Sequence, residues 1–158
     1  MEGKAVRESA SEYLELALPN DANGLGNVLG GKVMHLVDLA AAMAGMRHAR
    51  RPIVTASVDS LHFLHPVHLG ELIILRSSVN RVFRSSMEIG VKVMTEKLLT
   101  GERLHTCSAY LTFVAIDQEG RAIAVPPVIP ETDEDIRRYR QAGERREYRL
   151  AMRNRLKT

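Results

Sequence analysis

Two polar side chains on either side of a glycine-rich stretch are candidates for a site that binds an oxygen atom and carries out acid–base chemistry. Asn23 lies in the run Asp21-Ala22-Asn23-Gly24-Leu25-Gly26, and Asp38 follows it in a segment of almost wholly apolar residues. A carboxylate in apolar surroundings is suited to accept a proton from water. The Asn23 amide could hold that water or another bound oxygen. The competing structural interpretations are an ordinary helix-face aspartate and an asparagine that caps a turn.

Gly30 and Gly31 stand where this loop is expected to enter a helix over residues 31–47. The first N–H groups of a helix have no partner within the helix, and they attract a negative or polarised oxygen. Glycine also lets another molecule approach the main chain closely. The loop and helix start therefore predict a cradle for an oxygen atom.

Two nucleotide-binding motifs match this stretch incompletely. Gly26 and Gly31-Lys32 have the spacing of a Walker loop, but Val33 replaces the Ser or Thr that would hold magnesium. A Rossmann fingerprint that starts at Gly24 fails because Leu29 stands where its third glycine belongs. Because each motif lacks a required residue, the sequence argues against nucleotide chemistry at this stretch.

The elements that must position these residues follow from periodicity. Apolar residues alternate with a period of two in five segments, residues 11–18, 53–63, 71–83, 86–97 and 104–116. The last four are joined by connections of hairpin length, so antiparallel pairing is expected. A charged helix is expected from Thr132 onward. The prediction is an α+β fold in which an antiparallel sheet of five to six strands wraps one long central helix. Residues 1–130 would form the domain and residues 131–158 a basic helical tail.

Composition limits the class of protein. The chain has 158 residues, 45% of them hydrophobic and 26% charged, which suits one globular domain. Residues 136–158 carry nine Lys or Arg against two Glu, a charge of +7, whereas residues 1–135 carry thirteen against seventeen acids, a charge of −4. The single Cys107 fits a reducing compartment, so a cytoplasmic location without a membrane span is expected.

The stretch Asp21-Ala22-Asn23-Gly24-x-Gly26-Asn27-x-x-Gly30-Gly31-x-x-Met34-x-x-x-Asp38 resembles the signature of hotdog-fold acyl-CoA thioesterases. Further matches follow in the same order: Arg47-His48, Val54 to Asp59, Phe63 to Val67 with Gly70-Glu71, Arg84-Ser85-Ser86, and Val125-Pro126-Pro127. The resemblance covers about residues 11 to 130, nearly the whole expected domain.

The resemblance implies hydrolysis of acyl-CoA to a free acid and CoA, without a metal or redox cofactor. It implies that Asn23 and Asp38 are catalytic and come from opposite subunits of a dimer, so that each dimer has two sites. Main-chain N–H groups at Gly30-Gly31 would stabilise the oxyanion. Arg84, Ser85 and Ser86 lie where the family approaches CoA, and three dimers usually form a hexamer. Whether Asp38 acts as a general base or as a nucleophile stays open, and we favour the general base.

Alternatives from other classes need separate tests. A non-catalytic acyl-CoA sensor on the same fold would bind without hydrolysis, and a hydratase would need a histidine base that the glycine loop lacks. The basic tail could contact CoA phosphates or nucleic acid, but nucleic acid is the weaker interpretation because aromatic residues are not interleaved with the charges. The evenly spaced His62, His65 and His68 are expected to be structural, with no metal site. Cys107 is expected to be a core residue.

Overall fold

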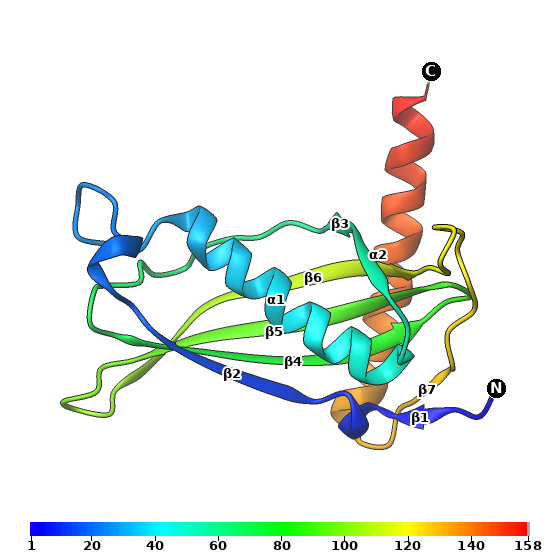
Figure 1. Cartoon of the computed structure of the whole chain (residues 1–158), viewed down its shortest axis with the longest axis horizontal. Coiled ribbons are helices and arrows are strands. Elements are labelled where there is room, and N and C mark those ends of the chain that lie inside the picture. The colour runs from blue at the N-terminus through cyan, green and yellow to red at the C-terminus, as the bar shows by residue number, and fades with distance from the viewer. Residues whose placement is uncertain (158) are drawn as a thin grey trace.

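One central sheet and one long helix make up most of the computed structural model, which describes residues 1–157 (Figure 1). The sheet has five antiparallel strands in the spatial order β2-β4-β5-β6-β3. Their bounds are β2 Ser11–Leu16, β3 Ile53–Val58, β4 Leu72–Val82, β5 Ser86–Glu96 and β6 Arg103–Ala115. Helix α1 spans Gly30–Ala49, and helix α2 spans Asp133–Leu156. A short parallel pair, β1 Lys4–Ala5 with β7 Val128–Ile129, and two 3-10 turns, η1 Val6–Glu8 and η2 Pro19–Asp21, complete the fold.

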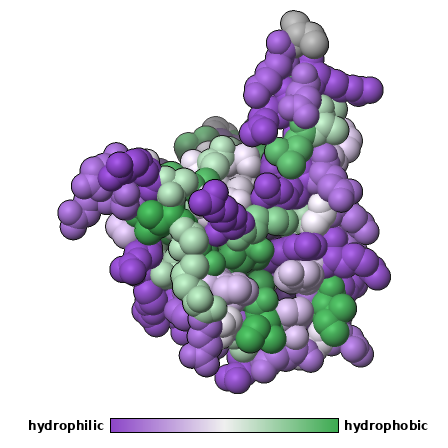
Figure 2. All heavy atoms as spheres, turned by 90° about the vertical axis from the view of Figure 1, so that its right-hand side faces the viewer, coloured by the Kyte–Doolittle hydropathy of each residue, from purple (hydrophilic) through white to green (hydrophobic). Residues whose placement is uncertain are grey.

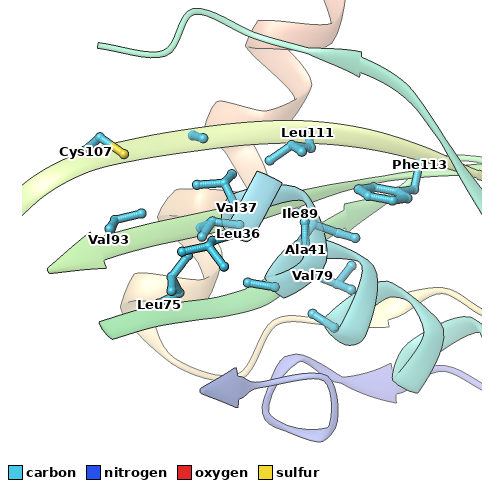
Figure 3. Packing of buried hydrophobic residues seen from close by; sticks show 14 of the residues in the cluster. Leu36, Val37, Ala41, Leu75, Val79, Ile89, Val93, Cys107, Leu111 and Phe113 are labelled. Atoms are coloured by element: carbon cyan, nitrogen blue, oxygen red, sulfur yellow. The ribbon is translucent and has the colours of Figure 1, made fainter. Parts of the chain in front are cut away.

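The alternation in the strands decides which face of the sheet meets α1. In β5, Met87, Ile89, Val91 and Val93 are buried in the same hydrophobic cluster as Leu36 and Val37 of the helix. Figure 3 shows these α1 side chains packed against residues of β4, β5 and β6. Burial of this apolar area is the main driving force for the fold.

Small residues bring the second half of α1 close to the sheet. A Cβ atom added at Gly45 would lie 2.7 Å from Ile53 Cδ1 and 2.8 Å from Ile89 Cδ1. The Ser77 hydroxyl of β4 donates a buried hydrogen bond of 2.7 Å to the carbonyl oxygen of Ala40. The helix is therefore held at a fixed depth on the sheet, and it can serve as a rigid support for the residues on its other side.

The predicted α+β hotdog architecture is confirmed, with corrections to element bounds. The helix expected over residues 31–47 extends over 30–49 and ends at Arg50, which has a left-handed backbone conformation. The strand expected over 53–63 is wrong beyond Val58. The regular pairing with β6, which is interrupted by a bulge between Thr55 and Ser57, stops after Val58. Asp59 and Leu64 still donate backbone hydrogen bonds to β6, and the Phe63 ring lies against the start of α1, so tertiary contacts override the alternating pattern.

Helix α2 is anchored on the face of the sheet opposite α1. Its first turn is capped by Thr132, whose hydroxyl accepts from the Asp135 N–H over 3.0 Å. Further along, Arg145 makes two hydrogen bonds, of 2.7 and 3.0 Å, to the carboxylate of Glu88, which is 0% exposed. The C-terminal end of α2 projects from the body (Figure 1), and Figure 2 shows it as a largely hydrophilic column.

The basic tail thus has an anchored part and a projecting part. Arg149 Nη1 lies 3.0 Å from Asp59 Oδ2, and residues 151–157 are exposed. The division into a domain at residues 1–130 and a tail at 131–158 stays a prediction. None of the helices within residues 1–157 is long and apolar enough to cross a membrane.

Candidate active site

The loop between η2 and α1 closes on itself around Asn23. Ala22 and Val28 form an isolated antiparallel bridge, and the Asn23 N–H donates to the carbonyl oxygen of Asn27 over 2.7 Å. Gly26 has a φ of +81°, a conformation that glycine adopts at little cost, and the chain turns there. The loop is therefore a tight hairpin-like structure, with Leu25 at its tip exposed to 84%.

The orientation of the Asn23 amide follows from its partners. Its Oδ1 accepts hydrogen bonds from the N–H groups of Leu25, over 2.8 Å, and Asn27, over 3.2 Å. Because both partners are donors, the atom that faces them must be the oxygen. The Nδ2 end, with its two N–H donors, therefore points away from these loop contacts. Through this end Asn23 can donate a hydrogen bond to an oxygen of a ligand, but it cannot accept one.

The start of α1 adds two unpaired donors beside this amide. No side chain caps the helix, and within residues 1–157 nothing accepts from the N–H groups of Gly30 and Gly31. The next two N–H groups, of Lys32 and Val33, already donate to the Leu29 carbonyl oxygen. The two glycines thus leave two backbone donors without a partner at the helix start.

The space at Gly31 has no explanation within the single chain. Gly31 lacks a positive φ, and a Cβ atom added there would meet nothing within 4 Å. A Cβ atom at Gly30 would lie 3.5 Å from the Phe63 ring, which covers one side of the helix start. Beside Gly30, a cavity of about 170 Å³ is lined by residues that include Asn23, Asn27, Gly30, Val33, Phe63 and His65.

Lys32, the lysine of the incomplete Walker match, is not available for phosphate binding. Its Nζ lies 3.3 Å from Glu15 Oε2 and 3.6 Å from Asp21 Oδ1. These ion pairs join the start of α1 to β2 and to the beginning of the loop. Lys32 therefore has a structural role that supports the loop. It is not free to contact a phosphate, as the nucleotide-binding interpretation requires.

Asp38 lies on the side of α1 that faces the edge strand β3. Its Oδ1 accepts a hydrogen bond of 2.8 Å from the Thr55 hydroxyl, and the carboxylate is half-buried in the single chain. The second oxygen is left for another partner. Thr55 received no role from the sequence, although it belongs to the Val54-to-Asp59 match; that match was the one signal that pointed to it.

Asn23 and Asp38 belong to separate parts of the chain surface. The helix rises about 1.5 Å per residue, so Asp38 is roughly 12 Å along the axis from Gly30. The loop that carries Asn23 lies beyond the helix start, away from Asp38 (Figure 1). One chain therefore presents a donor half-site, made of Asn23, Gly30 and Gly31, and an acid half-site, made of Asp38 and Thr55.

Arg84, Ser85 and Ser86 lie near the far end of α1. Val125 donates its N–H to the Arg84 carbonyl oxygen over 3.0 Å, and the neighbouring Pro126 carbonyl oxygen lies 2.7 Å from Nε2 of His48, near the end of the helix. Since α1 has 20 residues, its two ends are about 30 Å apart. Within one chain, the predicted CoA-binding residues are thus remote from Asn23.

The remaining candidates lie outside the two half-sites, except that His65 lines the cavity beside Asn23 and Gly30. Among residues 1–157 no group of three or more His, Cys, Asp or Glu side chains could hold a metal ion. Cys107 is buried in the core, and burial raises the pKa of its thiol to about 11. A larger cavity of about 670 Å³ lies against the outer face of the sheet beside α2, and it contains none of the residues predicted to do chemistry.

Comparison with known proteins gives consistent matches. Residues 25–102 match the family model named Thioesterase superfamily. The uncharacterized acyl-CoA thioester hydrolase YkhA of Bacillus subtilis is 41% identical over 144 residues, which cover 91% of this chain and 84% of that protein. An apo-hexameric acyl-CoA thioesterase superposes with a TM-score of 0.93 at 39% identity, covering 96% of this chain and 97% of the other.

An acyl-CoA hydrolase from Staphylococcus aureus has been solved with butyryl coenzyme A, coenzyme A and coenzyme A disulfide. It superposes with a TM-score of 0.91 at 35% identity, covering 98% of this chain and 94% of the other. Variants of that hydrolase with an aspartate, an asparagine or a threonine replaced by alanine have also been solved.

Proposed function

We propose that this chain, which belongs to the thioesterase superfamily, hydrolyses the thioester of acyl-CoA to a free acid and CoA. The observation that carries the proposal is the pair of half-sites that α1 forms with the Asn23 loop and with Thr55 of β3. One half-site offers only donors, as an oxyanion requires, and the other offers a carboxylate held by a hydroxyl group. Together they have the parts needed to add water to a carbonyl group.

The two half-sites are brought together by a second copy of the chain. The surface between them is apolar and uncovered: Met34 is 49% exposed, Leu39 39% and Val54 45%. A two-fold axis across this surface would place the start of one α1 helix beside the middle of the other. Asn23 and Gly31 of one subunit would then face Asp38 of the partner subunit, and each dimer would have two equivalent sites.

The spacing of the substituted residues in the Staphylococcus hydrolase supports this assignment. Its asparagine and aspartate are 15 positions apart, and its aspartate and threonine are 17 apart. Asn23, Asp38 and Thr55 have the same two separations in this chain. The three residues studied there by substitution thus have counterparts of the same type and spacing in both half-sites.

The chemistry follows from what each group can donate or accept. Asp38 takes a proton from water, and the resulting hydroxide adds to the thioester carbon. Asn23 Nδ2 and the N–H groups of Gly30 and Gly31 stabilise the oxyanion. The C–S bond then breaks, and the CoA thiolate leaves and takes up a proton. Thr55 orients the carboxylate so that its free oxygen faces the water.

Three further parts of the proposal concern assembly and location. Arg84, Ser85 and Ser86 contact the CoA moiety from another subunit, because in a single chain they lie far from Asn23. Three dimers assemble into a hexamer, as the hexameric state of the apo thioesterase neighbour suggests. A cytoplasmic location suits a chain whose one cysteine is a free thiol.

The decisive experiment compares Asp38→Asn with the wild-type protein in a hydrolysis assay that detects free CoA thiol. Asn keeps the size of the side chain and removes the proton acceptor, so kcat should fall by ~10²-fold or more, the usual scale for loss of acid–base catalysis. Asp133→Asn, at an exposed position at the start of α2, is the matched control and should be unaffected. Near-normal turnover by a folded Asp38→Asn protein would eliminate the mechanism. A wild-type protein that binds acyl-CoA without hydrolysing it would favour the alternative function, a non-catalytic acyl-CoA sensor.

Subunit mixing tests the shared site. Asn23→Ala and Asp38→Asn proteins should each be inactive, but a mixed dimer would contain one site with both residues intact. Activity should therefore return when the two variants are mixed under conditions that allow exchange. Continued inactivity, with exchange demonstrated by mass-tagged subunits, would place Asn23 and Asp38 of one site in the same chain.

A further inference from the structure

The connection between β3 and β4 contacts the glycine-rich loop through His68. The His68 ring donates from Nδ1 to Asn27 Oδ1 over 2.8 Å, and the two residues also form an isolated backbone bridge. The backbone of His68 is itself fixed, since its N–H donates to Glu71 Oε1 over 2.7 Å and Glu71 is only 7% exposed. His68 thus joins a buried anchor to an exposed loop.

Asn27 links the anchored His68 to Asn23 through backbone hydrogen bonds. Its carbonyl oxygen accepts from the Asn23 N–H over 2.7 Å, and its own N–H donates to Asn23 Oδ1 over 3.2 Å. The contacts therefore run without a gap from Glu71 through His68 and Asn27 to the amide of Asn23. The Asn27 side chain takes part only in the contact with His68, whereas its backbone makes both contacts with Asn23.

We propose that His68 and the Asn27 side chain are positioning residues that hold the donor end of Asn23 toward the substrate. This inference deepens the proposed thioesterase function and rests on it. A loop with an exposed tip and several glycines loses much conformational entropy when it is ordered, so a free loop would sample other amide orientations. Small displacements of a catalytic donor reduce the rate steeply, and a donor on a loop therefore needs a second layer of support.

The variants separate this role from a general structural one. His68→Ala removes the ring donor, and Asn27→Ala removes its acceptor but keeps every backbone contact of the loop. His68→Asn places an amide nitrogen near the position of Nδ1 and can restore the donor. His62→Ala is the matched control, because His62 is exposed in the same connection and makes no hydrogen bond within the described residues.

Steady-state kinetics should show that His68→Ala and Asn27→Ala each lower kcat by ~3–10-fold, the scale of one neutral hydrogen bond, with little change in KM. The double variant should be no worse than either single variant, since both remove the same contact. His68→Asn should return kcat to within about twofold of wild type, and His62→Ala should not change it. Additive losses, or a His68→Asn protein as slow as His68→Ala, would overturn the proposal.

Hydrogen exchange gives a second readout that does not depend on catalysis. In His68→Ala and Asn27→Ala, the N–H groups of residues 22–29 should exchange faster, while the rest of the chain and the unfolding temperature stay the same. This result can be obtained even if the wild-type protein hydrolyses no acyl-CoA, so failure of the proposed function is distinguished from failure of the positioning role. Unchanged exchange in His68→Ala would refute positioning, including the case in which kcat falls.

Discussion

The unexplained space at Gly31 leads to a prediction in which stability and activity move in opposite directions. In Gly31→Ala the helix start gains a better helix former, and apart from its own neighbours in the helix no atom lies within 4 Å of the new methyl group. Replacement of glycine by alanine at an unstrained position stabilises a protein by about 0.4–1 kcal/mol. For a chain of this size, that corresponds to a rise of roughly 1–4 °C in the unfolding temperature.

Activity should fall in the same variant. The methyl group would occupy the approach to the unpaired N–H groups of Gly30 and Gly31, so the oxyanion would lose a hydrogen bond. A hydrogen bond to a charged group contributes about 1.5–3 kcal/mol, which corresponds to a loss of ~10–150-fold in kcat/KM. Release of CoA thiol can be followed with a thiol-reactive chromophore. The protein contributes little background, because its one thiol, at Cys107, is buried.

Gly45→Ala is the matched control in the same helix. There the new methyl group would lie 2.7 and 2.8 Å from two isoleucine side chains, and overpacking costs about 1–3 kcal/mol. This cost exceeds the gain in helix propensity, so Gly45→Ala should be less stable than wild type while the folded fraction stays active. Wild-type kcat/KM in Gly31→Ala would refute the oxyanion site. A lower unfolding temperature in Gly31→Ala would show instead that the space is filled by packing between subunits.

Two further predictions concern stability. His48 is fully buried, and burial, with a contribution from Lys4, lowers the pKa of its imidazole. The unfolded chain therefore binds a proton that the folded chain does not, and the free energy of unfolding should decrease as the pH falls below about 6.5. His48→Gln keeps the donor to the Pro126 carbonyl oxygen but removes the titrating group, so it should flatten this pH dependence. The measurement is a series of denaturant titrations between pH 7 and roughly pH 5. An unchanged slope in His48→Gln would show that other groups cause the pH dependence. Arg145→Met leaves the buried Glu88 carboxylate without its cation and should cost about 3–5 kcal/mol. Calorimetry should show most of this loss recovered in Arg145→Met combined with Glu88→Gln, and a double variant as unstable as the single one would contradict the ion-pair explanation.

The strong periodic patterns made much of the fold predictable. Alternation in the segments that became β4, β5 and β6 continues over many residues, and both faces of the pattern correspond to real faces of the sheet. The segment after Val58 alternates just as clearly through Leu61 and Phe63, but it forms no regular ladder with a strand. It keeps isolated backbone hydrogen bonds to β6, and the Phe63 ring lies against the start of α1. Local pattern cannot distinguish these outcomes, because the choice depends on an apolar surface elsewhere in the chain.

In the candidate site, residue types could be predicted from the sequence, but the geometry of the side chains could not. Asn23 and Asp38 could be singled out because their chemistry is unusual for their surroundings. The direction of the Asn23 amide depends on which atoms of the loop meet it, and this is decided only when the loop is folded. Thr55 and His68 are ordinary polar residues in a sequence, and their importance arises from contacts across 17 and 41 positions.

The placement of both half-sites on a single rigid helix has a kinetic consequence. In a dimer with shared sites, each α1 would carry the oxyanion donors of one site and the proton acceptor of the other. Any tilt or shift of that helix when an acyl-CoA binds at the first site would move the acid of the second. The two sites would then be coupled through the rigid helix. Turnover would depend cooperatively on substrate concentration, because binding at one site would raise or lower the activity of the other.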